Sequence, residues 1–161
     1  AGVKNPWTYY CCCPANGYTS RFIHLPSAVT RALGIQLFRY GIAGFLHWGF
    51  NFYFSRLSRR LIDPFQVVDA DYGFPDGDSF IVYPGPECEP LDSIRNELMR
   101  EALQDQRALE LLVRLTSREE ACAVLDRACG GTLTFTDFPR SESALRAVRS
   151  AVNDAIRDAL K

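Results

Sequence analysis

The feature that most constrains the fold is a nearly continuous apolar run, AGFLHWGFN, at Ala43–Asn51. A strand with one face in water alternates apolar and polar residues, whereas a strand covered on both faces reads as a continuous run. The wider stretch around it is too short to cross a bilayer, and His47 and Asn51 interrupt it. The run therefore predicts a buried strand of a parallel sheet and no transmembrane span.

Two other short apolar segments have the same character. PWTYYCCC, at Pro6–Cys13, is typical of a buried strand of about six residues. SFIVYPG, at Ser79–Gly85, predicts a third buried strand that Pro84 ends. The stretch between Asn51 and this segment is rich in turn-forming residues, so we expect it to be irregular.

Helical patterns follow these strands. Apolar residues at helical spacing predict one helix over Pro26–Tyr40 and a long one from Asp92 or Ser93 to Leu115. A capping box predicts a helix over 117–128, and a final apolar stripe predicts one over 141–160. Parallel strands need crossover helices, so strands alternating with helices indicate the α/β class.

Three strands make a poor sheet, so the chain is expected to hold the last βα units of a larger (β/α)8 TIM-type barrel. Residues 1–115 would form those units, and residues 116–161 a C-terminal helical extension packed on the same domain. In a barrel the strand ends at Cys12, Asn51 and Tyr83 would share one rim. The chain contains no glycine-rich phosphate-binding fingerprint and no nucleophile elbow, and we expect no cofactor.

The charge balance argues against two classes of partner. Eighteen basic and nineteen acidic residues give a net charge of −1, with no long block of one sign. Nucleic acids and anionic membranes recruit strongly basic surfaces, so neither is an expected partner. No signal peptide is visible, although the chain starts at Ala1 without Met, so the possibility of export stays open.

The six cysteines have neither the spacing of a disulfide framework nor that of a zinc motif. Cys11, Cys12 and Cys13 are consecutive, and the other three lie far along the chain. Zinc sites favour paired ligands such as C-x2-C, so we expect buried free thiols and no metal site. Unpaired thiols favour a reducing, cytoplasmic compartment, without fixing the localisation.

Four motifs in order resemble one known family. They are GIQLFRYGIAGFLHWGFNFY, then DP, then GDSFIVYPG, and finally SIRNELMREALQDQRALELL. Over roughly Trp7–Leu115 the chain resembles the C-terminal part of the catalytic domain of glycoside hydrolase family 123. The resemblance implies a (β/α)8 barrel, of which this chain would hold about strands 6–8 with their helices.

The resemblance also implies an activity: hydrolysis of a terminal β-linked N-acetylhexosamine, typically N-acetylgalactosamine. In such enzymes the substrate's own acetamido oxygen attacks the anomeric carbon, an exception to the usual two-carboxylate scheme. An adjacent Asp-Glu pair on an earlier strand orients the acetamide and protonates the leaving oxygen. No Asp is followed by Glu in this chain, so we assign it no catalytic residue and expect it to be inactive alone.

The expected substrate-binding residues lie where the strands end. A sugar's apolar C–H face lies well on an aromatic ring, so Trp48 is the expected platform, and its phenylalanine neighbours and His47 are expected to pack. Asp78 could accept a bond from a sugar hydroxyl or simply bond its own turn. Of Tyr9 and Tyr10, one would face the barrel axis and the other a helix. The full set is Tyr9, Tyr10, Trp48, Asn51, Tyr53, Asp78 and Tyr83.

Two alternatives stay open: a non-catalytic carbohydrate-binding module and a purely structural fragment. An open three-stranded parallel sheet would leave unpaired edges and a bare apolar barrel face, features that natural proteins cover or close, and this favours a truncated barrel. The expected partners are therefore an amino-sugar glycoside and the missing N-terminal part of the barrel. Without that part, we expect the isolated chain to self-associate.

Overall fold

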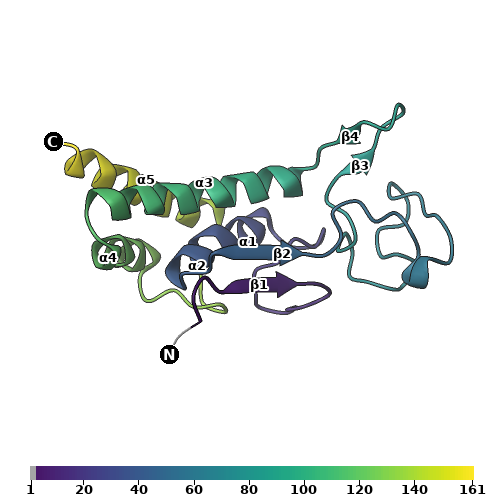
Figure 1. The fold of residues 1–161 in the computed structure, drawn as a ribbon, viewed down its shortest axis with the longest axis horizontal. Helices are drawn as coiled ribbons and strands as arrows, with labels where there is room; N and C mark the ends of the chain where they lie inside the picture. The colour runs from purple at the N-terminus through teal and green to yellow at the C-terminus, as the bar shows by residue number, and fades with distance from the viewer. Residues whose placement is uncertain (1–2) are drawn as a thin grey trace.

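The computed structural model describes residues 3–161. A two-stranded parallel sheet, β1 (Trp7–Tyr10) and β2 (Gly44–His47), lies below a layer of helices (Figure 1). The register pairs Trp7 with Gly44 and Tyr10 with His47. The prediction that these segments are parallel neighbours is confirmed, although each strand is shorter than expected.

Two short helices form the crossover between the strands: α1 (Ser27–Arg31) and α2 (Leu33–Arg39). One helix was predicted over Pro26–Tyr40; the interruption at Ala32 is small, since its φ of −59° and ψ of −18° remain right-handed helical. Tyr10 is buried against Leu33 and Leu37 of α2. The α2 helix therefore covers one face of the sheet.

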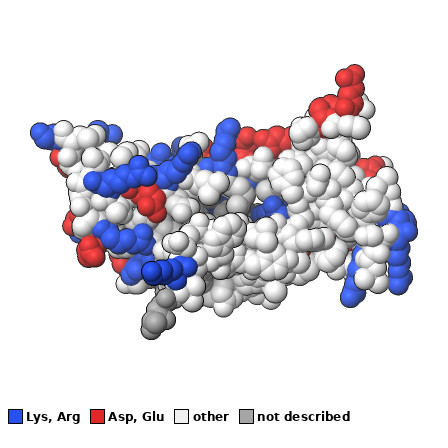
Figure 2. All heavy atoms as spheres, in the orientation of Figure 1, with Lys and Arg blue, Asp and Glu red and all other residues white. Residues whose placement is uncertain are grey.

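The opposite face of the sheet is uncovered among the described residues. Trp7, Tyr9 and Leu46 alternate with the covered positions and are 71%, 54% and 55% exposed. In the orientation of Figure 1, the surface over β1 and β2 carries few charged side chains (Figure 2). Such an exposed apolar surface is typical of a face that another element covers.

The prediction of a third parallel strand over Ser79–Gly85 is wrong. Only β3 (Tyr83–Pro84) is a strand there, and it pairs in antiparallel fashion with β4 (Pro90–Leu91). Phe80 instead forms an antiparallel bridge with Asn51. Residues 50–52, which follow Gly49 (φ 89°), run antiparallel to this segment: Phe52 N–H donates to the Ser79 carbonyl (2.9 Å), and Ile81 N–H donates to the Phe50 carbonyl (2.9 Å). A buried apolar loop and a buried strand look alike in sequence, because both are short apolar runs.

The stretch between β2 and β3 is irregular, as predicted. It contains a single 3-10 turn, η1 (Arg56–Ser58), and an isolated bridge between Phe54 and Leu61. It forms the right-hand side of Figure 1, away from the helices.

Three longer helices complete the chain: α3 (Ile94–Leu115), α4 (Arg118–Cys129) and α5 (Glu142–Ala159). Serines 93, 117 and 141 cap them, each side chain accepting a bond from the backbone N–H three residues on. Gly130 ends α4 in the left-handed conformation, with φ 78°. The helices predicted from capping and periodicity are confirmed within one or two residues.

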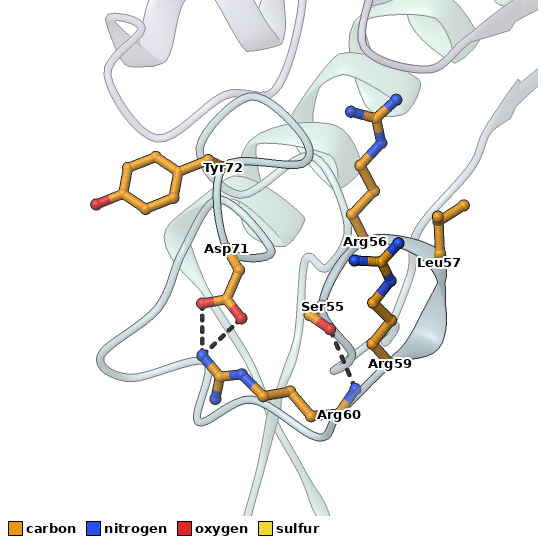
Figure 3. A pocket seen from close by; sticks show the side chains of 7 residues that line it. All are labelled: Ser55, Arg56, Leu57, Arg59, Arg60, Asp71 and Tyr72. Atoms are coloured by element: carbon orange, nitrogen blue, oxygen red, sulfur yellow. Dashed lines mark hydrogen bonds and ion pairs between the residues drawn. The ribbon is translucent and has the colours of Figure 1, made fainter.

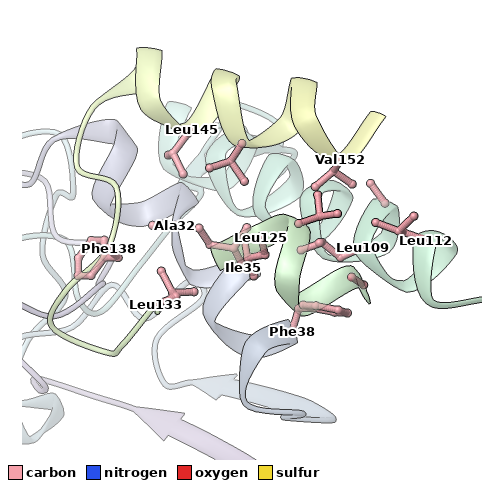
Figure 4. Packing of buried hydrophobic residues seen from close by; sticks show 14 of the residues in the cluster. Ala32, Ile35, Phe38, Leu109, Leu112, Leu125, Leu133, Phe138, Leu145 and Val152 are labelled. Atoms are coloured by element: carbon pink, nitrogen blue, oxygen red, sulfur yellow. The ribbon is translucent and has the colours of Figure 1, made fainter. Parts of the chain in front are cut away.

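The main core lies among the helices (Figure 4). Ile35 and Phe38 of α2 pack with Leu109 and Leu112 of α3 and with apolar residues of α4 and α5. Residues on both sides of position 115 therefore share one core. Between residues 3 and 161, no helix has both the length and the apolar character needed to cross a membrane.

A buried ion-pair network joins three of these helices. Asp105 of α3 accepts bonds from Arg31 of α1 (2.7 Å) and from Arg149 of α5 (2.8 Å). Its side chain is 6% exposed. Buried carboxylates need such paired partners, so the network fixes how α1 and α5 sit against α3.

We predict that Gly34→Ala destabilises the protein because α2 and α3 approach closely at this residue. A Cβ at position 34 would lie 1.8 Å from the backbone oxygen of Ala102. Forced overpacking costs about 1–3 kcal/mol or more, which exceeds the roughly 1 kcal/mol of helix propensity that alanine adds. Urea unfolding measures the difference. Gly131→Ala is the control, because a Cβ there meets nothing within 4 Å; equal stability of both variants would contradict the prediction.

Candidate functional site

The candidate site begins where β1 ends. The chain turns sharply through Cys11–Cys13: Cys11 N–H donates to the Cys13 carbonyl (3.1 Å), and Cys12 adopts a left-handed φ of 59°. Trp48 N–H donates to the Tyr10 carbonyl (3.1 Å), so the end of β2 lies beside this turn. The carboxyl ends of both parallel strands thus meet at one edge.

Asp78 reaches this edge from the loop that precedes β3. Its side chain is fully buried, and Oδ2 accepts a bond from the backbone N–H of Cys12 (3.0 Å). Burial raises the pKa of Asp78, while the bonds from Cys12 and the charge of Arg21 oppose that rise. The carboxylate therefore ties two segments that are far apart in sequence.

His47, the last residue of β2, lies against the same carboxylate. Its Nδ1 donates to the Trp48 carbonyl (2.7 Å), because a carbonyl oxygen can only accept. Its Nε2 lies 3.3 Å from Asp78 Oδ1, yet neither atom has a hydrogen-bond partner among the described residues. Burial, followed by the charge of Arg21, lowers the pKa of His47 to about 4. The ring is therefore neutral near neutral pH.

Two buried arginines complete the arrangement. Arg21 Nη2 donates to the carbonyls of Trp48 (3.1 Å) and Gly49 (2.5 Å). Arg95, at the start of α3, donates through Nη1 to the carbonyls of Gly77 (2.7 Å) and Arg21 (3.2 Å). Burial lowers the pKa of both, that of Arg21 to about 10. They hold the loops around Asp78 in fixed positions.

We call these residues the buried polar cluster. Its members are Cys12, Arg21, His47, Asp78 and Arg95. Several of its polar atoms lack a hydrogen-bond partner within residues 3–161: Arg21 Nε, His47 Nε2, Asp78 Oδ1 and Arg95 Nη2. Buried unpaired polar atoms are rare in stable proteins and are concentrated at functional sites.

The two tyrosines of β1 point in opposite directions. Tyr10 is 6% exposed and packs edge-on against Phe45, with 5.2 Å between ring centroids, on the face that α2 covers. Tyr9 is on the uncovered face, and the adjacent Cys11 thiol is the main cause that raises the pKa of its hydroxyl to about 12. Tyr9 is therefore the accessible member of the pair.

Trp48 and Asn51 follow β2 but have different surroundings. Trp48 is half-buried, and its ring lies 4.9 Å from the rings of both Phe52 and Phe74. Asn51 is exposed on the segment that bridges to Phe80. Trp48 thus belongs to an aromatic cluster that leaves part of its ring accessible.

Tyr53 and Tyr83 are brought together around Phe80. The Tyr53 hydroxyl donates to the Val82 carbonyl (2.9 Å), and its ring lies 5.9 Å from that of Phe80. Tyr83 packs on Phe80 and Phe65 at 5.2 and 5.0 Å. Within residues 3–161 neither of these tyrosines stacks with Tyr9, Tyr10 or Trp48, so the predicted residues form at least two groups.

A hollow of about 440 Å³ lies elsewhere, beside η1 (Figure 3). Within it Arg60 pairs with Asp71, while Arg56 and Arg59 pair with no described acid. Tyr72 at its edge is 95% exposed. These groups are solvated rather than gathered around a buried centre, so the hollow is a weaker candidate than the buried polar cluster. Its lining comprises Ser55, Arg56, Leu57, Arg59, Arg60, Asp71 and Tyr72.

Sequence reasoning missed Arg21 and Arg95, and it placed Cys12 at the expected rim without naming it as a site residue. Arg21 lies in a loop and Arg95 in the first turn of a helix, where arginine is usually solvated. No spacing rule links Cys12 to Asp78, which lies 66 residues later. The interpretation of His47 as a hydrogen-bonded packing residue agrees with its 4% exposed side chain and its bond to Trp48.

The comparison with protein families identifies the class of protein. Residues 1–112 match the model of the glycoside hydrolase 123 catalytic domain. The matched residues therefore identify a glycoside hydrolase domain, a class that acts on carbohydrate. It belongs to glycoside hydrolase family 123, because the match covers 112 of its 161 residues. The resemblance seen in the motifs is confirmed, and no curated protein matches the chain.

We predict that Gly49→Ala destabilises the protein by more than the strain of a left-handed alanine at position 49 alone would. A Cβ at position 49 would lie 2.6 Å from the Asp78 carbonyl oxygen and from Ser79 Cα. Gly17→Ala is the matched control, since Gly17 has a similar φ of 92° and nothing within 4 Å. Left-handed strain costs each variant about 1–2 kcal/mol, and the backbone clash adds about 1–3 kcal/mol at position 49 only.

Urea unfolding and tryptophan emission measure these two effects. Gly49→Ala should unfold at a lower urea concentration than Gly17→Ala and should alter the emission of the neighbouring Trp48. Equal unfolding midpoints would contradict a tight approach of residues 78–79 to Gly49.

Proposed function

We propose that this chain contributes part of the sugar-binding mouth of an enzyme that hydrolyses terminal β-linked N-acetylhexosamine, with N-acetylgalactosamine as the favoured sugar. The single observation that carries the proposal is membership of glycoside hydrolase family 123. The reaction would be substrate-assisted: the acetamido oxygen attacks the anomeric carbon, the glycosidic bond breaks, and water then opens the cyclic intermediate.

This chemistry needs two carboxyl groups that the chain does not supply as an adjacent pair, since no Asp is directly followed by Glu. Asp78 cannot replace them, because it is fully buried beneath the Cys11–Cys13 turn. We therefore propose that the catalytic carboxyl groups come from a polypeptide segment outside these 161 residues.

The uncovered face of the β1–β2 sheet supports a place in a barrel. In a (β/α)8 barrel one face of every strand meets the helices and the other faces the barrel interior. Tyr10 and Phe45 occupy the helix side, and Trp7, Tyr9 and Leu46 the other side. We propose that β1 and β2 are neighbouring strands of a barrel and that Trp7, Tyr9 and Leu46 face the barrel interior.

This arrangement ranks the candidate sugar-binding residues. Tyr9, Trp48 and Asn51 retain accessible surface near the carboxyl ends of the strands. Tyr10 is buried against α2, and the Tyr53 hydroxyl is already bonded to a backbone carbonyl. We propose that Trp48 and Tyr9 offer ring faces to the sugar. Four other predicted residues would position the segments that form the mouth without contacting the sugar: Tyr10, Tyr53, Tyr83 and Asp78.

Hydrolysis of chromogenic glycosides tests the proposed reaction. The chain alone should release no nitrophenol from nitrophenyl N-acetyl-β-galactosaminide, and a longer protein that includes the catalytic carboxyl pair should release it. Intramolecular nucleophiles reach effective molarities of about 10⁵ M or more, so that enzyme should cleave the plain β-galactoside at least about 10³-fold more slowly. Equal turnover of both glycosides would rule out assistance by the acetamide.

A binding measurement together with this hydrolysis assay distinguishes the two alternatives from the proposed hydrolase. Binding of N-acetylgalactosamine by the chain alone, with no hydrolysis by any longer protein, would favour a carbohydrate-binding module. Neither binding nor hydrolysis would favour a purely structural fragment.

We predict that the isolated chain self-associates through the uncovered sheet face. Leu46 is 55% exposed in the middle of this face, so Leu46→Lys should shift the chain toward monomer in sedimentation or gel filtration. Leu103→Lys is the control: Leu103 is similarly exposed, at 49%, but lies on α3, and its substitution should change little. A monodisperse wild-type monomer would contradict the proposal.

A further inference from the structure

The turn after β1 places two thiols side by side. The sulfur atoms of Cys11 and Cys12 lie 3.7 Å apart, and both residues are half-buried, so solvent reaches them. Two Zn–S bonds of about 2.3 Å at a tetrahedral angle would separate their sulfurs by about 3.8 Å. The pair already has the spacing of two ligands on one tetrahedral ion.

Asp78 provides a third donor from a distant part of the chain. One ligand atom from each of Cys11, Cys12 and Asp78 lies within 4.8 Å of the other two. The bond from Cys12 N–H to Asp78 Oδ2 fixes the carboxylate in this position. Three donors are therefore gathered by the fold, not by adjacency in the sequence.

A second, independent observation points to a cation here. Asp78 Oδ1 is buried without a hydrogen-bond partner among residues 3–161, and it faces His47 Nε2 at 3.3 Å. A buried carboxylate needs a partner, and a cation bound to Asp78 would supply one.

We infer that Cys11, Cys12 and Asp78 form a binding site for a thiophilic divalent cation of the Zn²⁺ type. Thiolate ligands select such ions over Mg²⁺ and Ca²⁺, which prefer oxygen. Each thiol would lose its proton to solvent on binding. Three protein ligands leave a fourth tetrahedral position for water or another ligand.

The charges around the site are compatible with this assignment. Arg21 is the nearby cation, but its Nη2 is bonded to the carbonyls of Trp48 and Gly49. Two thiolates and one carboxylate carry three negative charges, which balance the two of Zn²⁺ and the one of Arg21. Arg95 is directed to the carbonyls of Gly77 and Arg21.

The inference departs from the expectation of no metal site and does not depend on the proposed hydrolase activity. That expectation rested on the spacing of cysteines and histidines alone, and the third donor is an aspartate 66 residues beyond Cys12. The site would lie just past the carboxyl end of β1.

Metal stoichiometry of the purified chain tests the inference. The reduced chain is incubated with ZnCl2 and desalted, and its zinc is quantified by mass spectrometry. We expect about one Zn²⁺ per chain, and Co²⁺ in its place should give a thiolate charge-transfer band and the intense visible bands of tetrahedral coordination. Cys12→Ser and Asp78→Asn should each weaken Zn²⁺ binding at least about tenfold, measured by chelator competition.

Cys13→Ser is the matched control, since Cys13 is adjacent but outside the group of donors. It should retain both zinc and the cobalt spectrum, and circular dichroism should show that all variants are folded. Absence of bound zinc in the wild type, or equal affinity in wild type, Cys12→Ser and Asp78→Asn, would overturn the inference. An equal loss in Cys13→Ser would also overturn it.

Discussion

Parallel pairing of β1 with β2 is the interaction on which the rest of the structure depends. It brings the Cys11–Cys13 turn and the Trp48–Gly49 segment out at one edge, where the Trp48 N–H donates to the Tyr10 carbonyl. The helices α1 and α2 follow from it, because parallel strands require a crossover connection. The edge formed in this way is where Asp78 and the two buried arginines converge.

The buried polar cluster then holds an irregular part of the chain in place. Residues 48–82 have little regular structure, so few backbone ladders fix them. Arg21, Arg95 and Asp78 provide long-range bonds to backbone groups instead. These charged groups are desolvated. Removing one of them therefore lowers the free energy of unfolding by more than the value of the lost hydrogen bond, because its former partner stays buried without a counterpart. Hydrogen bonds from buried charged groups, rather than backbone ladders, therefore connect the segments of the site.

Much of the regular structure could be predicted from sequence, and most of the site could not. Ser93, Ser117 and Ser141 mark helix starts through local bonds, so capping signals located these helices well. The prediction of a parallel strand over Ser79–Gly85 is wrong, because the apolar residues of this segment do not reveal that it pairs in antiparallel fashion with residues 50–52. The contact between Cys12 and Asp78 joins residues that are 66 positions apart, so no local pattern could predict it.

Membership of glycoside hydrolase family 123 and the uncovered sheet face support the proposal that β1 and β2 are neighbouring strands of a barrel completed by polypeptide outside this chain. Closure would pair the outer edges of both strands and cover Trp7 and Leu46. The amides of a paired strand open only with the barrel, whereas those of an open edge exchange freely.

Hydrogen–deuterium exchange of the β1 and β2 amides tests whether these strands close into a barrel. The experiment compares the isolated chain with a longer protein that carries the catalytic carboxyl pair, with α4 amides as the internal reference. We expect markedly slower exchange in β1 and β2 of the longer protein and unchanged exchange in α4. Identical exchange of the two strands in both proteins would contradict it.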